Sequence, residues 1–243
     1  MRWLRGSVLA LILLALTAGR VGADPIDVGE TPLKPDGKAY ELHSDSAGTL
    51  WVSDTSGDEI RAVSPADGSY IAYPVSYPSD ARPDDAGRIW FTDGAAHFGY
   101  LYPTTTGEAE IRTWAAGATG DLNLRGLGID DDGLIWMTSF YEVGTVSQVR
   151  SFDPDSHELC AYVLPGGASS SYLVYRDGAL WLANLSLQRI YRVETASPHR
   201  VSWWEIDDVT SFVEGLALDG EGRLWLADSG AGVLRRFNAG DHQ

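Results

Sequence analysis

One short motif recurs five times along this chain at a nearly constant spacing. In each copy a glycine stands three residues before a tryptophan, an aliphatic residue directly precedes the tryptophan, and a short polar residue follows it by three. The repeated tryptophans are Trp51, Trp90, Trp136, Trp181 and Trp225, separated by 39, 46, 45 and 44 residues. A period of about 40–45 residues is the length of a four-stranded propeller blade. The spacing therefore predicts an all-β propeller.

Each complete unit divides into four predicted strands. In the third unit we expect an inner strand over residues 124–130, a second over 134–139, a third over 146–152 and an outer strand over 159–164. The last unit, residues 213–237, has only three strands, while residues 27–33 form a spare strand before the first unit. Pairing this N-terminal strand with residues 233–237 would leave no unpaired edge. We predict a single five-bladed β-propeller whose N-terminal strand completes the last blade.

The repeated residues have structural roles in this interpretation. The glycine lies in the hairpin between inner and second strands, where a positive φ is needed. The tryptophans wedge between neighbouring blades and bury large aromatic areas. The run Asp130, Asp131, Asp132 and Gly133 is typical of turn chemistry; a calcium loop is the alternative, since consecutive carboxylates can ligate a hard cation.

The first 23 residues have the pattern of an export signal. Arg2 and Arg5 precede an apolar run over residues 8–16, and Val21, Gly22 and Ala23 form a small-residue cleavage site. The apolar run is shorter than the roughly 20 residues of a spanning helix, so a membrane anchor is the weaker alternative. We expect a signal peptide over residues 1–23, a propeller over residues 24–243, no membrane span in the mature chain, and a secreted or periplasmic location.

Charge and cysteine content narrow the classes of partner. The chain has a formal net charge of −16 and a single cysteine. Such an acidic surface would repel phosphate backbones, so nucleic acid is excluded as an expected partner. One cysteine permits no intramolecular disulfide. We expect a monomer that binds a small molecule or a protein.

Polar residues stand eleven positions before each repeated tryptophan, where the inner strands are expected to begin. These candidate ligand-binding residues are Tyr40, Ser79, Arg125, Ser170 and Glu214. Inner strands line the central channel of a propeller, and ligands bind at its mouth. Arg125 and Glu214 carry opposite charges, and the two alternatives are a ligand-binding pair and a buried ion pair that plugs the channel.

The repeats resemble those of a known group of propellers. The segments DDDGLIWMTS, DGALWLANLSLQRIYRV and GLALDGEGRLWLADSGAGVLRRF are similar to streptogramin (virginiamycin B) lyase-like repeats, and the last is also similar to NHL-type and gluconolactonase/regucalcin-type (SMP-30-like) repeats. The lyase resemblance implies a seven-bladed fold and a histidine, a glutamate and magnesium that open a cyclic depsipeptide by elimination. This chain has repeats for five blades, and its candidate positions hold no histidine.

The gluconolactonase-type resemblance implies a divalent-metal site. Glu214 and Gly215 resemble that group's opening Glu-Gly motif, which makes Glu214 a candidate ligand. Asp54, Asp93 and Asp228, three residues after their tryptophans, could add oxygen ligands for magnesium or calcium; their alternative role is hydrogen bonding to strand-end backbone.

Two functions remain open from the sequence, and no catalytic residue is identified. The first is an exported binding or scaffolding module that holds a ligand or protein partner at the channel mouth. The second is a metal-dependent enzyme, either a lyase or a lactone hydrolase.

Overall fold

The computed structural model describes residues 37–117, 122–142, 148–166, 170–184, 188–206 and 213–237, without the side chains of residues 140–142, 170 and 171. All regular structure in these ranges is β-strand, arranged in five antiparallel sheets. None of the described residues forms a helix long and apolar enough to cross a membrane. The predicted signal peptide and the predicted strand over residues 27–33 lie outside the described residues.

The sheets follow one another in chain order. The first contains β1 (Ala39–Ser44), β2 (Leu50–Asp54), β3 (Glu59–Val63) and β4 (Tyr70–Pro74). The second contains β5 (Pro78–Pro83), β6 (Ile89–Asp93), β7 (His97–Pro103) and β8 (Ala109–Ala115). The third contains β9 (Leu122–Ile129), β10 (Ile135–Glu142), β11 (Gln148–Phe152) and β12 (Leu159–Val163). The fourth contains β13 (Ser170–Arg176), β14 (Ala179–Asn184), β15 (Arg189–Glu194) and β16 (Val201–Glu205). The fifth contains β17 (Val213–Leu218), β18 (Leu224–Asp228) and β19 (Val233–Phe237).

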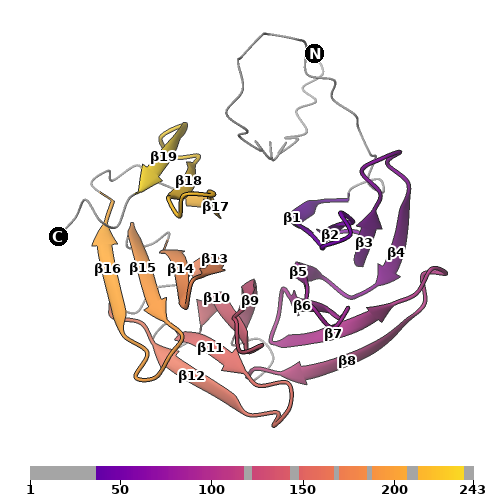
Figure 1. Ribbon diagram of the computed structural model, residues 1–243, viewed down its shortest axis with the longest axis horizontal. Coiled ribbons are helices and arrows are strands. Elements are labelled where there is room, and N and C mark those ends of the chain that lie inside the picture. Colours follow the sequence, from indigo (N-terminus) through magenta and orange to yellow (C-terminus); the bar gives the residue numbers. More distant parts are fainter. Residues whose placement is uncertain are drawn as a thin grey trace, which may run out of the picture. The chain divides into compact units, whose positions relative to one another are not determined.

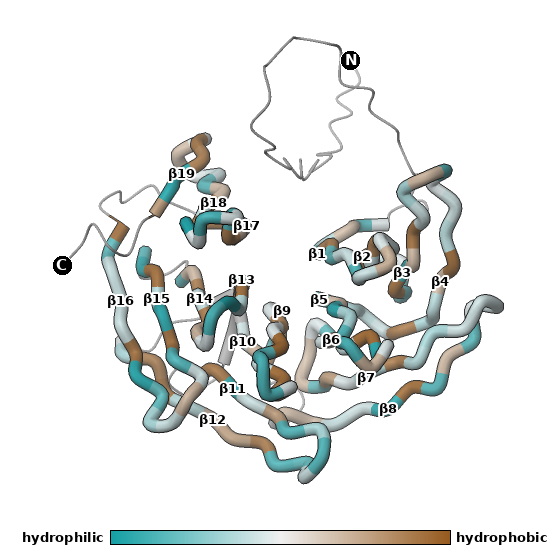
Figure 2. Tube along the Cα trace, viewed as in Figure 1, coloured by the Kyte–Doolittle hydropathy of each residue, from teal (hydrophilic) through white to brown (hydrophobic). Residues whose placement is uncertain are grey.

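The five sheets are the blades of a five-bladed β-propeller, as the repeat predicted. The first strand of each blade, β1, β5, β9, β13 or β17, is innermost in Figure 1. Each blade packs on the next through these inner strands. Hydrophobic residues recur within the strands of every blade, and the hairpin between β11 and β12 is strongly hydrophilic (Figure 2).

The repeated tryptophans pack between neighbouring blades. Trp51 of the first blade joins a cluster with Ile89 and Phe91 of the second, and Trp136 of the third joins Leu180 and Leu182 of the fourth. The same arrangement links the second blade to the third and the fourth to the fifth. The predicted wedge role is therefore confirmed for the first four tryptophans. Trp225, the last, is half-buried, and no packed strand pair joins the fifth blade to the first among the described residues.

An aspartate six residues before the tryptophan fixes the hairpin at the start of a blade. Asp130 accepts the indole N–H of Trp136 at 2.7 Å and the backbone N–H groups of Asp132 and Leu134 at 3.1 and 2.9 Å. Asp45, Asp84 and Asp219 make the equivalent bonds in their blades. The repeated glycine has a positive φ in all five copies, for example +80° at Gly133. The aspartate run at 130–132 thus begins with a turn residue, as the structural interpretation predicted.

Candidate functional site

Each inner strand is interrupted by a β-bulge near its start. The pairing of inner and second strands shifts by one residue between Pro78 and Asp80 in the second blade and between Val213 and Gly215 in the fifth, and it shifts at the same place in the others. Tyr40, Ser79, Arg125 and Glu214 all lie within these bulges. Bulges re-aim side chains and are frequent next to functional sites. The positions chosen eleven residues before the tryptophan are therefore structurally equivalent in four blades.

The fourth blade differs by one residue. Its inner hairpin is a two-residue turn, Asp177 and Gly178, with φ values of 51° and 73°, which is the type I′ geometry that Asp-Gly favours. The other blades use longer turns closed by the aspartate. Ser170 therefore pairs directly with Asn184, and Ser171 takes the bulge position. The predicted residue, Ser170, therefore lies one residue before the bulge, because the turn of this blade is shorter. The side chains of Ser170 and Ser171 are not among those that the structure describes.

A first group of side chains, which we call the mouth site, consists of Tyr40, Arg125, Tyr172 and Glu214. The guanidinium carbon of Arg125 lies 4.6 Å from the centre of the Tyr40 ring, and its Nε donates to Asn123 Oδ1 at 2.6 Å. Burial raises the pKa of Tyr172, and so do a hydrogen bond with Tyr40 and the charges of Glu41 and Glu214. The mouth site thus joins an arginine to carboxylates through two hydrogen-bonded tyrosines.

Ser79, the remaining predicted residue, is fully buried. Its hydroxyl oxygen has no hydrogen-bond partner within the described part of the chain. Pairing between Arg125 and Glu214 themselves, which the sequence suggested, stays a prediction; the contact seen for Arg125 is with Tyr40.

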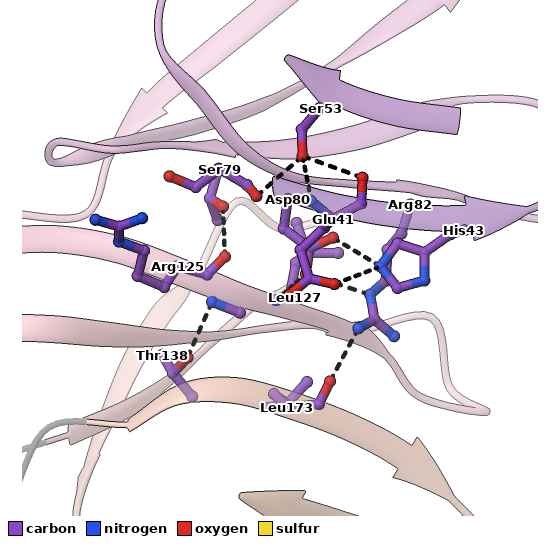
Figure 3. Close-up of polar contacts among 12 residues, drawn as sticks. Glu41, His43, Ser53, Ser79, Asp80, Arg82, Arg125, Leu127, Thr138 and Leu173 are labelled. Atoms are coloured by element: carbon purple, nitrogen blue, oxygen red, sulfur yellow. Dashed lines mark hydrogen bonds and ion pairs between the residues drawn. The ribbon is translucent and has the colours of Figure 1, made fainter. Parts of the chain in front are cut away.

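A second group, the inner-strand cluster, consists of Glu41, His43, Asp80 and Arg82 (Figure 3). His43 Nε2 lies 2.9 Å from Asp80 Oδ1, and Arg82 Nε lies 3.4 Å from Asp80 Oδ2. Asp80 Oδ2 also accepts the backbone N–H of Leu127 at 2.8 Å. Arg82 extends to the fourth blade, where its Nη2 donates to the carbonyl of Leu173 at 2.9 Å. The Asp80 carboxylate and the Arg82 guanidinium thus connect residues of the first four blades through hydrogen bonds and ion pairs.

Close packing of β9 on β13 brings that carbonyl within reach. A Cβ added at Gly128 would lie only 2.3 Å from Leu173 Cδ2, so a larger residue here would require the Leu173 side chain to move. Leu173 therefore packs directly against the backbone of β9 at Gly128.

The protonation states follow from burial and from the neighbouring charges. Burial would raise the pKa of Asp80, but Arg82, His43 and the Leu127 N–H outweigh it and hold the pKa below its usual range. Burial and then Arg82 lower the pKa of His43 against the pull of Asp80. At neutral pH Asp80 is thus a carboxylate and His43 is a neutral imidazole whose Nε2 carries the proton.

Glu41 is the group whose ionisation is most perturbed. Burial and the nearby Asp80 raise its pKa to about 8, while Arg82 opposes the rise. Its carboxyl lies 3.9 Å from His43 Nε2 and accepts no hydrogen bond from any other described residue. Glu41 is therefore mostly protonated at neutral pH, beside an ion pair that is already balanced.

The carboxylates proposed for a metal lie at the ends of three different blades. Asp54 accepts the N–H of Gly57 at 2.9 Å and pairs with Arg61 at 3.1 Å; Asp93 accepts the N–H of His97 at 2.8 Å. Asp228 pairs with Arg235 at 2.6 Å. These contacts are the strand-end roles given above as the alternative. Within the described ranges no group of three or more histidine, cysteine, aspartate or glutamate side chains is arranged to hold a metal ion.

Sequence reasoning missed five of the residues that meet here: Glu41, His43, Asp80, Arg82 and Tyr172. A usable signal existed. One and three residues after the bulge position, the inner strands of the first two blades carry charge or histidine, whereas the equivalent positions of β9 are Gly126 and Gly128 and those of β17 are Gly215 and Ala217.

Comparisons with known proteins bear on the fold. No protein-family profile and no curated protein sequence matches the chain. Solved structures similar to it include virginiamycin B lyase from Staphylococcus aureus, with a TM-score of 0.70 and 17% identity over 85% of this chain and 72% of the lyase. A streptogramin B lyase structure matches with a TM-score of 0.71 and 18% identity, over 86% of this chain and 72% of that one. The fold is that of a streptogramin lyase-like β-propeller.

Other propellers are similar to the chain as well. A structure described as an auxiliary nutrient binding protein from Bacteroides thetaiotaomicron matches with a TM-score of 0.63 and 13% identity, over 84% of this chain and 55% of that one. The TM-scores establish the propeller fold, and identities this low leave the activity to be argued from the residues.

Proposed function

We propose that this lyase-like propeller is an exported binding module that holds a small polar ligand at the mouth of its central channel. One observation carries the proposal: Tyr40, Arg125, Tyr172 and Glu214 come from four different blades, and contacts or charge effects connect them. Arginine and tyrosine are typical of binding sites because they combine a large contact area with directed hydrogen bonds.

Charge at this place is not a requirement of the fold. Apolar clusters fill much of the space between neighbouring blades, and buried charges cost free energy unless they are paired. Where β1 and β5 carry Glu41 and Asp80, the inner strand of the fifth blade has Gly215. The concentration of ionisable groups on particular blades therefore supports a role in recognition. The competing explanation is a purely structural plug of the channel.

Export is the second part of the proposal. The basic start, short apolar run and small-residue cleavage site of residues 1–23 support a cleaved signal. Cleavage would leave a still more acidic chain, because the leader contains arginines and no acidic residue. A secreted or periplasmic binding protein is the result.

The test compares ligand-induced stabilisation in three proteins. Melting temperatures of the wild type, Arg125→Ala and Arg112→Ala are measured against a library of amino acids, amines, carboxylic acids, sugars and nucleosides at millimolar concentration. A ligand that binds the native state raises the melting temperature by mass action. We expect at least one class to stabilise the wild type and Arg112→Ala, whose exposed arginine lies on β8, but not Arg125→Ala.

A different outcome would favour the plug. If no compound shifts the wild type and Arg125→Ala loses cooperative melting by itself, Arg125 is a structural residue and the binding function is wrong.

A divalent-metal-dependent lyase or lactonase is the second candidate. It would need Glu214 and at least one of Asp54, Asp93 and Asp228 at a single ion. The latter three already accept backbone N–H groups and, in two cases, pair with arginines in their own blades. These residues do not fit a shared metal, so we rank the enzyme below the binding module.

A further inference from the structure

The fourth blade lacks the aspartate that fixes the first hairpin of the other blades. In the second blade, Asp84 Oδ2 accepts the indole N–H of Trp90 at 2.9 Å and the Nε–H of Arg88 at 2.6 Å. The fifth blade repeats both contacts, at 2.8 and 2.6 Å. One carboxylate oxygen thus accepts from an indole and from a guanidinium at the same time.

The strand register places an arginine where this carboxylate would lie. The backbone N–H of Asp84 pairs with the carbonyl of Arg88, which stands two residues before the tryptophan. In the fourth blade the residue two before Trp181 is Ala179, and its partner in the hairpin is Arg176. Arg176 therefore takes the place of the turn aspartate. Within the described part of the chain, no residue accepts the indole N–H of Trp181.

A pocket of about 130 Å³ lies at this hairpin. This hairpin pocket is lined by Arg176, Trp181 and Arg192 of the fourth blade and by the end of β17. The mouth site is at the opposite end of the same strands, because Tyr172 and Glu214 stand near the starts of β13 and β17. A single water molecule needs roughly 10–15 Å³, so the hairpin pocket has room for a small organic group.

Arg192 brings unused donors to the hairpin pocket. It pairs with Trp181 across β14 and β15, and its guanidinium carbon lies 5.9 Å from the centre of the indole ring. Its Nη1 donates to Glu194 Oε1 at 2.9 Å. Its Nε and Nη2 donate to no described residue. An indole N–H and two guanidinium nitrogens are thus available to one acceptor.

Arg176 adds positive charge rather than donors. Its guanidinium donates to the backbone carbonyls of Asp219 and Gly220 in the fifth blade, and these carbonyls carry no net charge. Its ionic partner is Asp177, at 3.2 Å. The side chain of Asp177 is 87% exposed, so solvent screens this ion pair and weakens it. The hairpin pocket therefore keeps a positive potential.

We infer that the hairpin pocket binds a carboxylate from outside the chain, which accepts the indole N–H of Trp181 and the unused N–H groups of Arg192. The ligand takes the part that Asp84 plays within the second blade. Guanidinium groups bind carboxylates well because their N–H groups match the two oxygens. The source of the carboxylate is a small organic acid or the carboxyl end of a peptide. This site does not depend on the mouth site or on the proposed function.

The experiment follows the indole N–H signals by proton–nitrogen NMR of the isotope-labelled full chain at neutral pH and constant ionic strength. Trp181→Phe identifies the signal of Trp181 by its disappearance. The probes are sodium acetate, N-acetylglycine, which resembles a peptide carboxyl end, the neutral acetamide, and sodium phosphate. Sodium chloride serves as the salt control.

A carboxylate should shift the Trp181 signal downfield until it saturates, since the N–H gains a charged acceptor. Acetamide and chloride should leave it in place. The Trp225 signal should not move with any probe, because its N–H already has an acceptor within the chain. If N-acetylglycine binds about ten-fold more tightly than acetate, a peptide end is the source. Similar affinities for the two probes indicate a small acid.

Three variants separate recognition from a structural effect, each after circular dichroism has shown that it is folded. Arg192→Gln should weaken carboxylate binding about ten-fold or more, because a hydrogen bond to a charged donor is lost. Arg176→Asp restores the turn aspartate, so its Trp181 signal should start at the shifted position and not respond to acetate. Arg112→Ala, on the exposed face of β8, should bind as the wild type.

Four results would overturn the inference. The Trp181 signal could stay unmoved by both carboxylates at high millimolar concentration, or it could respond to acetamide as strongly as to acetate. Tighter binding of phosphate than of either carboxylate would mean that the ligand class is wrong. Unchanged carboxylate affinity in Arg192→Gln would place the binding elsewhere. None of these results bears on the mouth site, whose test depends on Arg125.

Discussion

His43 Nε2 and Asp80 Oδ1 lie 2.9 Å apart on the inner strands of neighbouring blades. The same carboxylate holds Arg82 of its own strand and the Leu127 N–H of the third blade. This polar junction makes the alignment of the first three inner strands depend on one charged group, and it lies next to the residues that we propose bind the ligand.

Replacing Asp80 with asparagine should lower the free energy of unfolding by about 3–5 kcal/mol, because it leaves Arg82 without its counter-charge in a desolvated place. Urea denaturation monitored by tryptophan fluorescence measures the change. Asp132→Asn, at an exposed turn position, is the matched control and should change stability by less than about 0.5 kcal/mol. A loss below about 1 kcal/mol for Asp80→Asn would show that the junction contributes little.

Stability should fall as pH rises toward 8, because Glu41 is protonated in the folded protein up to about pH 8 but ionises near pH 4.5 when unfolded. The slope from this group is at most about 1.4 kcal/mol per pH unit. The charged and titratable groups that interact with Glu41 include Asp80, Arg82, His43 and Tyr172. His43, with a lowered pKa, costs stability only as pH falls below its usual 6.5, so the range from pH 6.5 to 8 isolates Glu41.

Glu41→Gln tests this directly. The variant should lose the decline between pH 6.5 and 8 and exceed the wild type in melting temperature at pH 9, where the wild type buries a charge. Parallel curves for the two proteins would mean that Glu41 does not carry the pH dependence.

Removing the turn aspartate Asp130 should destabilise the third blade. Asp130→Ala leaves the indole N–H of the fully buried Trp136 and two backbone N–H groups without their acceptor, and we expect a loss of about 2–4 kcal/mol. Asp132→Ala in the same turn is the control. Chemical denaturation measures the free energy of unfolding of both variants. Equal small losses would show that the glycine, and not the aspartate, determines the stability of the turn.

The predicted closing strand is tested by deletion. β19 ends its blade one strand short of the other four in the described residues, and a groove of about 470 Å³ lined by Ile190, Trp203, Trp204 and Phe237 lies beside it. Removing residues 24–34 should lower the melting temperature and promote aggregation, because the edge would stay unpaired. Unchanged melting of a monomer, seen by calorimetry and light scattering, would refute the closure.

Metal dependence is tested with a chelator. If the chain is the binding module that we propose, its melting temperature should be the same after EDTA treatment and after magnesium or calcium is added back at millimolar concentration. A rise of several degrees with either ion, lost in Glu214→Gln, would instead support the metal-dependent enzyme.

The candidate site was only partly predictable from the sequence. Tyr40, Arg125 and Glu214 could be chosen because a fixed offset from the tryptophan places them at the bulge. Ser170 missed that position by one residue, because the turn at Asp177 and Gly178 closes the hairpin with fewer residues. His43 was assigned to the first inner strand, but its partner Asp80 lies 37 residues away, and no local pattern connects them.

The sequence by itself determined the blades. Hairpin turns and the glycine with positive φ depend on residues within one repeat, and the tryptophan wedge depends on two successive copies of the same repeat, so the spacing is enough to specify them. Which charges meet was decided by the tertiary structure. Arg82 and the carbonyl of Leu173 are 91 residues apart and come together because the inner strands β5, β9 and β13 of successive blades pack side by side. Burial then changes the protonation of Glu41, since a pKa depends on surroundings that only the packed inner strands create.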